Sequence, residues 1–408
     1  MSINTTTRNA TIEDLATMLQ AQHVASHDFV ASASALDSQG GVIHVADAED
    51  HLSEEGVTKA PGVYRPTSVA DQQLADATGI PVRYMRRMRE SRPDLYDANV
   101  NGWLHGAVGV EGDHLVTRAE PDPRKFLLRT FSAQDGSEGI LRAVLSDRYR
   151  VIDNLDVLMS VLAAVRESGL DVDVRSADLS ERRMIVKLNA PAITALAPTL
   201  LKGYRSPFGD PDVDAARRFG NVPDDTREVG RVGNAPMLSA GIRITNSEVG
   251  EGALAIVPEV TVLVCTNGMV QTMDAMRKIH LGSRMAEEGP VKWSEETRQA
   301  QKVLVQRQTI DAVSAFLNPD YLATVVARIE AKAGDPLSGP VNDTVETVAK
   351  TLAWTEEEQK GILDHFIRGG QMTKGGVLNA VTSYSQIVAS PDRADELDSS
   401  AMRVLDLA

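Results

Sequence analysis

The chain contains a single cysteine, Cys265, and only 4% aromatic residues among its 408 residues. One thiol excludes an internal disulfide framework and any metal cluster built from several thiolates of one chain. Because Cys265 lies in the apolar run TVLVCT, we expect it to be a small buried core residue. With so few aromatic residues, the cores should consist mainly of Ala, Val, Leu, Ile and Met.

Long apolar runs are also missing. No stretch approaches the roughly 20 apolar residues that span a bilayer. The first residues, MSINTTTRNATIEDL, contain no apolar signal core. We therefore expect no membrane partner and a location in the reducing environment of a cytoplasm.

Positive charge is outweighed over the whole chain, because 57 acidic residues against 42 basic ones give a net charge of −15. This charge argues against indiscriminate nucleic-acid binding by the entire surface. Its distribution is uneven: residues 1–60 hold 9 acids and 2 bases, whereas residues 61–150 hold 12 acids and 13 bases. A locally basic surface within an acidic protein is compatible with these numbers.

The order of strand-like and helix-like segments predicts an α+β fold. We expect a central, mostly antiparallel sheet with flanking helices, a helical N-terminal unit and an all-helical C-terminal region. The corresponding regions are an acidic, partly mobile segment (1–62), a helical unit (63–110), a central α+β domain (111–290) and a helical C-terminal region (291–408).

Within the central domain, alternating and apolar runs predict several strands, a helix over Leu155–Ser168 and a later hairpin over 237–267. The first strands are expected at His114–Ala119, Lys125–Phe131 and Ile140–Leu145. Residues 203–236 are rich in Gly, Pro and Asp, which is typical of a long loop. Toward the C-terminus, Thr355 before three glutamates predicts a helix N-cap, and Gly369-Gly370 a helix end.

The segment 68–91 has a pattern typical of a helix-turn-helix unit. Gly79 would form the turn, and Pro81 suits the first turn of the second helix. That helix carries four arginines beside Tyr84, Met85 and Met88, namely Arg83, Arg86, Arg87 and Arg89. Such arginines reach phosphates or guanine edges when a helix enters the major groove. The alternative is a helical hairpin with a solvated basic face.

A second basic pattern combines cations with tyrosines. Single-stranded nucleic acid is held by cationic grooves with aromatic platforms, since phosphates repeat and every base has a face for stacking. The alternative is ordinary surface charge paired with Asp147, Asp153 and Glu138. The candidate nucleic-acid-binding residues are Arg124, Lys125, Arg129, Arg142, Arg148, Tyr149, Arg150, Arg183, Lys187, Lys202, Tyr204, Arg205, Arg277, Lys278 and His280.

No pattern in the chain asks for an enzyme, a cofactor or a metal. The glycines near 106–112 and the segment GGQMTKGG lack the order of a dinucleotide turn or a phosphate loop. His23 and His27 are four residues apart, but no third metal ligand follows from the spacing. Neither a catalytic nor a metal-binding residue is assigned.

Four stretches resemble a known family: LRAVLSDRYRVIDNLDVL, ITNSEVGEGAL, LVCTNGMV with the basic run to His280, and GGVLNAVTSYSQ. They are similar, in order and spacing, to the phage/plasmid-like proteins called domain of unknown function 932, over roughly residues 60–395. The resemblance implies a gene on a mobile element, a role in DNA metabolism and the cytoplasm of a bacterial host.

The order of elements also resembles the β-β-β-α core of single-strand annealing proteins of the Rad52-like class, with a helix expected at 268–285. We therefore expect a homo-oligomeric protein that binds, and in that class anneals, single-stranded DNA without bond chemistry. Two alternatives remain open. One is an interaction protein that inhibits or decoys a host defence enzyme, which makes a host protein its partner. The other is duplex DNA binding through the 68–91 unit.

Overall fold

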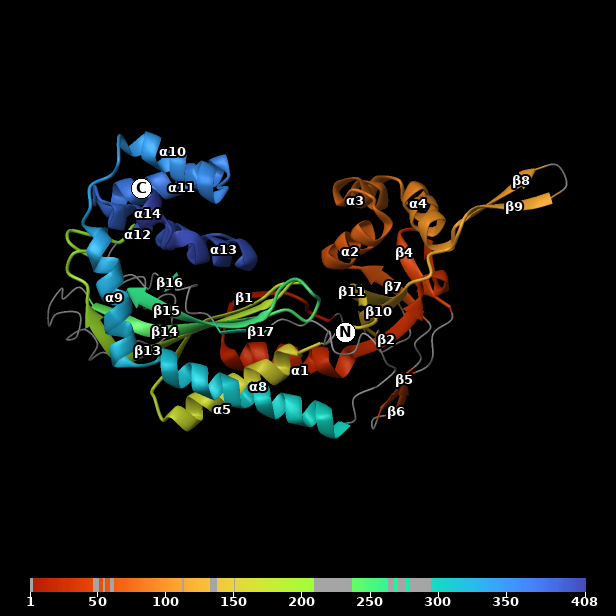
Figure 1. The fold of residues 1–408 in the computed structure, drawn as a ribbon, viewed down its shortest axis with the longest axis horizontal. Coiled ribbons are helices and arrows are strands. Elements are labelled where there is room, and N and C mark those ends of the chain that lie inside the picture. Colours follow the sequence, from red (N-terminus) through yellow and green to blue (C-terminus); the bar gives the residue numbers. More distant parts are fainter. Residues whose placement is uncertain are drawn as a thin grey trace.

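The computed structural model describes residues 3–46, 51–53, 56–58, 62–111, 114–132, 138–149, 151–208, 237–262, 268–270, 276–278 and 295–408. The fold is α+β, as predicted, and it has two lobes (Figure 1). The large lobe is built on a seven-stranded sheet and the small lobe on a six-stranded sheet. The expected, mostly antiparallel strand pairing is confirmed, and the strands are divided between these two main sheets and two two-stranded ones.

The sheet of the large lobe is antiparallel between all neighbouring strands. Its order is β1 (Thr7–Ala10), β12 (Asp173–Leu179), β13 (Met184–Leu196), β14 (Met237–Asn246), β15 (Leu254–Val262) and β16 (Gly268–Val270), and β17 (Met276–Lys278) also pairs with β15. The helix expected at 268–285 is therefore wrong for the described residues, because β16 and β17 satisfy the backbone groups along the edge of β15.

Side chains alternate between the two faces of this sheet. One face carries Ile242, Ile244 and Ile256 in the main hydrophobic core. Three helices lie along that face, as Figure 1 shows: α1 (Ile12–Ala25), α5 (Asn154–Ser168) and α8 (Glu295–Phe316); α9 (Pro319–Ala333) crosses the end of the sheet toward the C-terminal helices. The opposite face carries Lys187 and Arg243, which bind carboxylates of a C-terminal helix. We call it the polar face.

The C-terminal region is helical, as predicted, and lies over the polar face (Figure 1). It contains α10 (Val341–Leu352), α11 (Glu356–Gly369), α12 (Lys374–Ser385), α13 (Pro391–Ala401) and α14 (Val404–Leu407). The two predicted ends of α11 are confirmed. Thr355 forms a capping box with Glu358, and Gly370 takes the left-handed conformation at φ 72°.

The sheet of the small lobe has the order β2 (Ser26–Ser32), β10 (Lys125–Phe131), β11 (Gly139–Ser146), β7 (Gly62–Pro66), β4 (Val42–Val45) and β3 (Leu36–Gln39). A 3-10 turn, η1 (Ala33–Ala35), joins β2 to β3, and α2 (Ser68–Thr78), α3 (Val82–Ser91) and α4 (Pro93–His105) pack on this sheet. Two hairpins, β5 (His51–Ser53) with β6 (Gly56–Thr58) and β8 (Ala107–Glu111) with β9 (His114–Ala119), complete the lobe.

The domain boundaries differ from those expected. The N-terminal segment is not a separate unit, because β1 pairs in the large lobe while β2 pairs with β10 in the small lobe. The expected domain 111–290 is divided as well. β10 and β11 belong to the small lobe, whereas α5, which follows them in sequence, packs in the large lobe. None of the helices in the described part of the chain combines the length and apolar character needed to cross a membrane.

Candidate nucleic-acid interface

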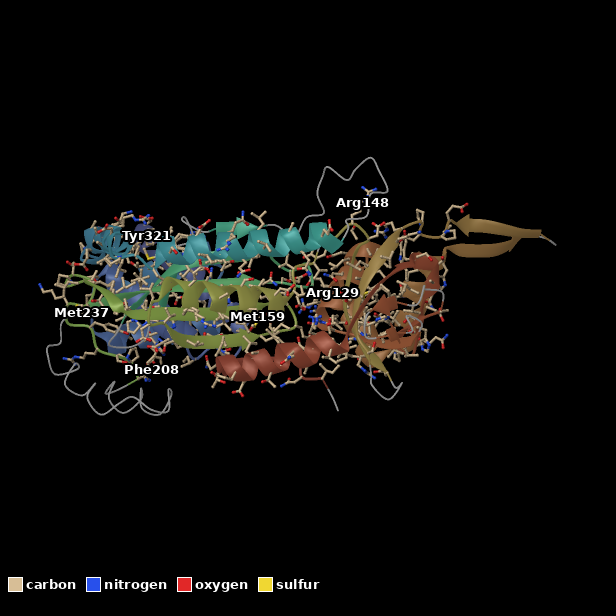
Figure 2. The ribbon with its side chains drawn as sticks, turned by 90° about the horizontal axis from the view of Figure 1, so that it is seen from below. Arg129, Arg148, Met159, Phe208, Met237 and Tyr321 are labelled. Atoms are coloured by element: carbon tan, nitrogen blue, oxygen red, sulfur yellow. The ribbon has the colours of Figure 1, made fainter. Side chains whose placement is uncertain are left out.

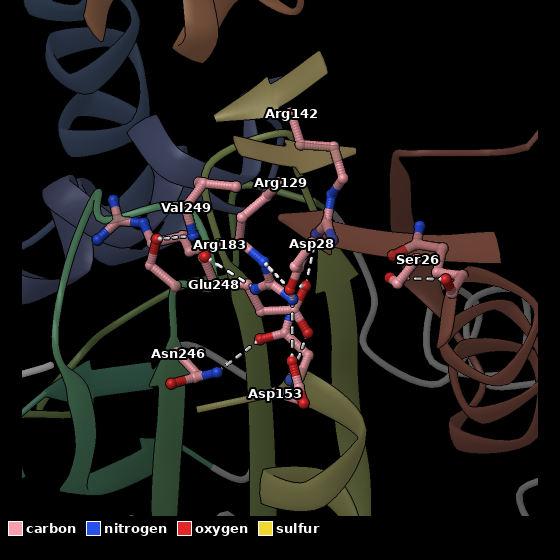
Figure 3. A network of polar contacts seen from close by, with 12 residues as sticks. Ser26, Asp28, Arg129, Arg142, Asp153, Arg183, Asn246, Glu248 and Val249 are labelled. Carbon is pink, nitrogen blue, oxygen red and sulfur yellow. Dashed lines mark hydrogen bonds and ion pairs between the residues drawn. The ribbon is translucent and has the colours of Figure 1, made fainter. Parts of the chain in front are cut away.

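Arg129, a central residue of the predicted basic groove, is buried at the junction of the two lobes. Only 2% of its surface is exposed. Its guanidinium donates to Asp28 Oδ2 at 2.9 Å, to Asp153 Oδ1 at 3.1 Å and to the backbone oxygen of Glu248 at 2.9 Å. Figure 3 shows these groups converging from both lobes. Arg129 therefore joins the lobes and has no surface left for a phosphate, which corrects its predicted role.

Arg142 extends the same network. Its guanidinium lies 2.5 Å from Glu248 Oε2 and stacks over the Phe131 ring, 4.2 Å from the ring centre. Glu248 Oε1 accepts a hydrogen bond from the backbone N–H of Asn154 at 2.6 Å. We call the set Asp28, Arg129, Arg142, Asp153 and Glu248 the junction network. Both cations of this network are paired with carboxylates, so Arg142 is also corrected as a DNA ligand.

Opposing effects act on the Glu248 carboxyl. Burial alone would raise the pKa of Glu248, but Arg142, Arg129 and the N–H of Asn154 together hold it below its ordinary value of 4.5. A carboxyl whose pKa is lower in the folded state contributes stability above its unfolded pKa. That contribution is lost as the pH falls through the folded value. Glu248 therefore makes the protein sensitive to acid, whereas burial raises the pKa of the neighbouring Asp153, which acts in the opposite direction.

We expect Glu248→Gln to flatten the acid limb of the stability curve. Below about pH 4.5 the slope should decrease by up to one proton, which is about 1.4 kcal/mol per pH unit. Urea unfolding measured between pH 3 and pH 7 tests this slope. Glu138→Gln removes a more exposed carboxylate, which pairs with Arg65, and serves as the control. Equal flattening in both variants would show that the junction network has no special part in acid sensitivity.

Lys187 in β13 and Arg183, which directly precedes this strand, face a helix. Lys187 Nζ lies 2.5 Å from Asp398, and Arg183 Nε lies 2.6 Å from Asp392, both on α13. Lys187 is 6% exposed. Arg183 also lies 3.6 Å from Asp395. These pairs hold α13 on the polar face, so the prediction that Lys187 and Arg183 contact phosphates is corrected.

The predicted stacking tyrosines pack inside the protein. Tyr149 joins a small cluster with Val69, Leu145 and Val249, and burial raises its pKa to about 12. Tyr204 packs against the main core and beside Gly369. Neither ring is an open platform, and both assignments are corrected.

The remaining candidates do not converge on one surface. Arg124 pairs with Asp122 at 2.5 Å, while Lys125, Arg148, Lys202 and Arg205 are exposed. Figure 2 shows Arg148 beside the junction and Phe208, which follows Arg205 closely in sequence, away from it in the large lobe. Of the other candidates, Arg277 and Lys278 are described only as backbone of β17, and Arg150 and His280 lie outside the described residues.

The helix-turn-helix prediction agrees better with the structure. α2 ends at Gly79 in the left-handed conformation, at φ 70°, and α3 begins after Pro81. Met85 and Met88 are buried, but Tyr84 is 52% exposed, so its predicted place in the apolar stripe is wrong.

The arginines of this unit divide into two groups. Arg89 lies 2.7 Å from the buried carboxylate of Asp71, and Arg86 donates to the backbone oxygen of Ser68 at 2.9 Å. These two hold α3 against α2. In contrast, Arg83 and Arg87 are exposed, and neither has an ion pair or side-chain hydrogen bond within the described ranges.

Sequence reasoning named Asp153, which pairs with Arg129, but missed the other carboxylates that pair with the candidate cations. Asp28 comes from β2, Glu248 from the turn after β14, and three aspartates from α13, all far from their partners in sequence. One signal was available: Arg129 stands in the strand KFLLRTF and Arg243 in IRIT, and a charge within an apolar strand requires a buried partner.

No metal site emerges from the part of the chain that the structure describes, because no three His, Cys, Asp or Glu side chains are suitably grouped. His23 lies in α1 and His27 in β2, where His27 is 2% exposed. In comparisons with known proteins, this chain matches no family model, no curated protein and no solved structure.

Proposed function

We propose that the protein binds DNA through the outward surface of α3, as a duplex-binding protein of phage or plasmid DNA metabolism. One observation carries this proposal: Arg83 and Arg87 lie one helical turn apart and exposed, with no carboxylate partner among the described residues, while Arg86 and Arg89 hold α3 against the rest of the lobe. In helix-turn-helix proteins, exposed residues near the start of the second helix contact the major groove.

The position of α3 supports the proposal. α3 lies on the same side of the small lobe as α2 and α4, and no C-terminal helix overlaps it in the view of Figure 1. The side chains of Arg83 and Arg87 are exposed and therefore accessible to a partner. The net charge of −15 repels a polyanion elsewhere, so binding depends on a few local contacts and on low salt.

We expect the double variant Arg83→Gln/Arg87→Gln to weaken duplex binding strongly. Each lost phosphate contact lowers the slope of log K against log salt by about 0.9, so the slope should decrease by about 2. Anisotropy of a labelled duplex, titrated at several salt concentrations, measures affinity and slope together. The same titration with the matched single strand defines the preferred form of DNA.

The control is the double variant Arg166→Gln/Lys360→Gln, which removes the same charge from exposed positions on α5 and α11. It should leave the slope unchanged. Equal losses in both double variants would indicate a general charge effect and overturn the proposal. So would failure of the wild-type protein to bind duplex DNA at low salt.

Single-strand binding and annealing stay predictions, but the surface that we now propose for them is that of α3. Tyr84 is 52% exposed between Arg83 and Arg87 in sequence, and a ring beside cations suits base stacking. A preference for the single strand in the titration above would select this form. Homo-oligomerisation likewise stays a prediction, which the mass from light scattering tests.

A second candidate function is an interaction protein that occupies the nucleic-acid site of a host defence enzyme. It is supported by the ion pairs that Arg129, Arg142, Arg183 and Lys187 form with carboxylates inside the protein. Because these cations do not offset charge elsewhere, the rest of the chain keeps an excess of negative charge. An acidic surface of this kind imitates DNA. The anisotropy titration distinguishes the two candidate functions, because a decoy of DNA requires no affinity for DNA itself.

A further inference from the structure

Two large aromatic rings are exposed on the neighbouring helices α3 and α4 (Figure 1). Trp103 on α4 is 60% exposed, although Tyr96, Val100 and Leu104 of the same helix are buried in the core of the small lobe. Tyr84 on α3 is 52% exposed. A single exposed ring needs no explanation, because such residues are common on protein surfaces. Two rings on adjacent helices do, if they lie on the same side of the lobe.

The two rings extend from the seam between α3 and α4. The helices contact each other through Met88 and Asn99, because Asn99 Nδ2 lies 3.6 Å from Met88 Sδ. Tyr84 precedes Met88 by four residues, and Trp103 follows Asn99 by four. Residues four apart lie on the same side of a helix, one turn from each other. Tyr84 and Trp103 therefore lie on the sides of α3 and α4 that are turned toward each other. We call this region the α3–α4 seam.

A second set of contacts places the two rings at the same end of the seam. The backbone N–H of Asp122 donates to the backbone oxygen of Leu104, at the end of α4, at 3.1 Å. The carboxylate of Asp122 binds Arg124, whose Nη2 donates to the backbone oxygen of Ala77 at 2.6 Å. Ala77 lies at the end of α2, and only residues 79–81 separate α2 from α3. The end of α4 is thus connected to the start of α3, and each of these ends carries one of the rings.

The charges beside the rings favour an anionic ligand. Arg83 directly precedes Tyr84, and Arg87 lies three residues after it, which is adjacent on the helix surface. Both arginines are exposed, and neither forms an ion pair within the described ranges. Glu90, the one acidic residue of α3, lies near the other end of the helix. Aromatic rings beside cations suit a ligand that combines flat rings with negative charge, as a nucleotide does.

We propose that the α3–α4 seam binds an unpaired DNA base, which stacks on Trp103 and Tyr84 while Arg83 and Arg87 contact the adjoining phosphates. This inference rests on the DNA binding through α3 proposed above and specifies the form of the DNA. Bases inside a duplex are stacked on one another, whereas an unpaired base offers its face to an aromatic side chain. The preferred ligand is therefore a duplex that continues into a single strand, and Trp103 is the residue that recognises the unpaired part.

Fluorescence anisotropy of the full chain with three labelled DNAs tests the proposal: a blunt duplex, the same duplex with a single-stranded overhang, and the same overhang without bases. The overhang should raise affinity roughly tenfold over the blunt duplex, because base stacking is gained. The abasic overhang keeps the phosphates and should lose most of this gain. Trp103→Ala should bring the ratio of the two affinities close to one, and Trp103→Phe, which keeps a ring, should restore most of it. Arg83→Gln/Arg87→Gln should weaken binding of both DNAs.

The control is Ile367→Ala, at an apolar position on α11 that is 67% exposed, and it should leave the affinity ratio unchanged. Equal affinity for the blunt and overhang duplexes overturns the role of the seam but not DNA binding by α3. A full gain from the abasic overhang does the same, because phosphates would then explain it. Failure to bind any of the three DNAs overturns both proposals. If Trp103→Ala lowers the mass from light scattering and keeps the affinity ratio, the ring joins copies of the chain and the proposal is wrong.

Discussion

Replacing Arg129 by methionine should destabilise the folded protein by about 3 kcal/mol. The guanidinium is 2% exposed and lies within 4 Å of Asp28, Asp153 and Glu248. Its removal leaves three carboxylates close together, and among the described ion pairs only Glu248 keeps another cation, Arg142. Because the partners come from both lobes, we also expect the lobes to separate more easily.

Urea unfolding, followed by circular dichroism, measures this loss as a lower midpoint. Arg148→Met is the matched control, since this arginine follows β11 in the small lobe and is exposed. It should change stability by less than about 0.5 kcal/mol. Arg129→Lys keeps the charge but not the several donors of the guanidinium, so its urea midpoint should lie between those of Arg129→Met and Arg148→Met. If Arg129→Met unfolds at the same urea concentration as Arg148→Met, the junction network contributes no stability.

Local elements were the most predictable part of the fold. The bounds of β9 and β10 agree with the sequence prediction, and α5 begins one residue earlier than predicted. Strand alternation and helix periodicity depend on neighbouring residues, and both are visible in the chain. The helix turn at Gly79 and the capping box at Thr355 were predictable for the same reason.

The candidate site was less predictable, because the sequence shows where charged residues occur but not which of them become neighbours in the fold. Arg129 and Lys187 look like groove residues in the sequence, yet their carboxylate partners lie 101 and 211 residues away along the chain. Pairing at such separations depends on which strands become neighbours. Similarly, the division of 111–290 between two lobes follows from β2 pairing with β10, which no local pattern records.

The pair between Lys187 and Asp398 attaches α13 to the sheet, and a double-mutant cycle should reveal strong coupling. Lys187 is 6% exposed and Asp398 2% exposed. Lys187→Met alone leaves a buried carboxylate with Ser385 as its remaining side-chain partner, and should destabilise the protein by about 3 kcal/mol.

Asp398→Leu alone leaves a buried ammonium and should have a similar effect. The double variant Lys187→Met/Asp398→Leu replaces the pair by apolar groups of similar size, and should recover most of the loss. Urea unfolding of the four proteins gives the coupling energy, which we expect to exceed about 2 kcal/mol. The exposed pair Lys350 and Glu346 on α10 provides a control cycle, with an expected coupling of about 0.5 kcal/mol. Additive losses in the first cycle would mean that α13 is held by its apolar contacts alone.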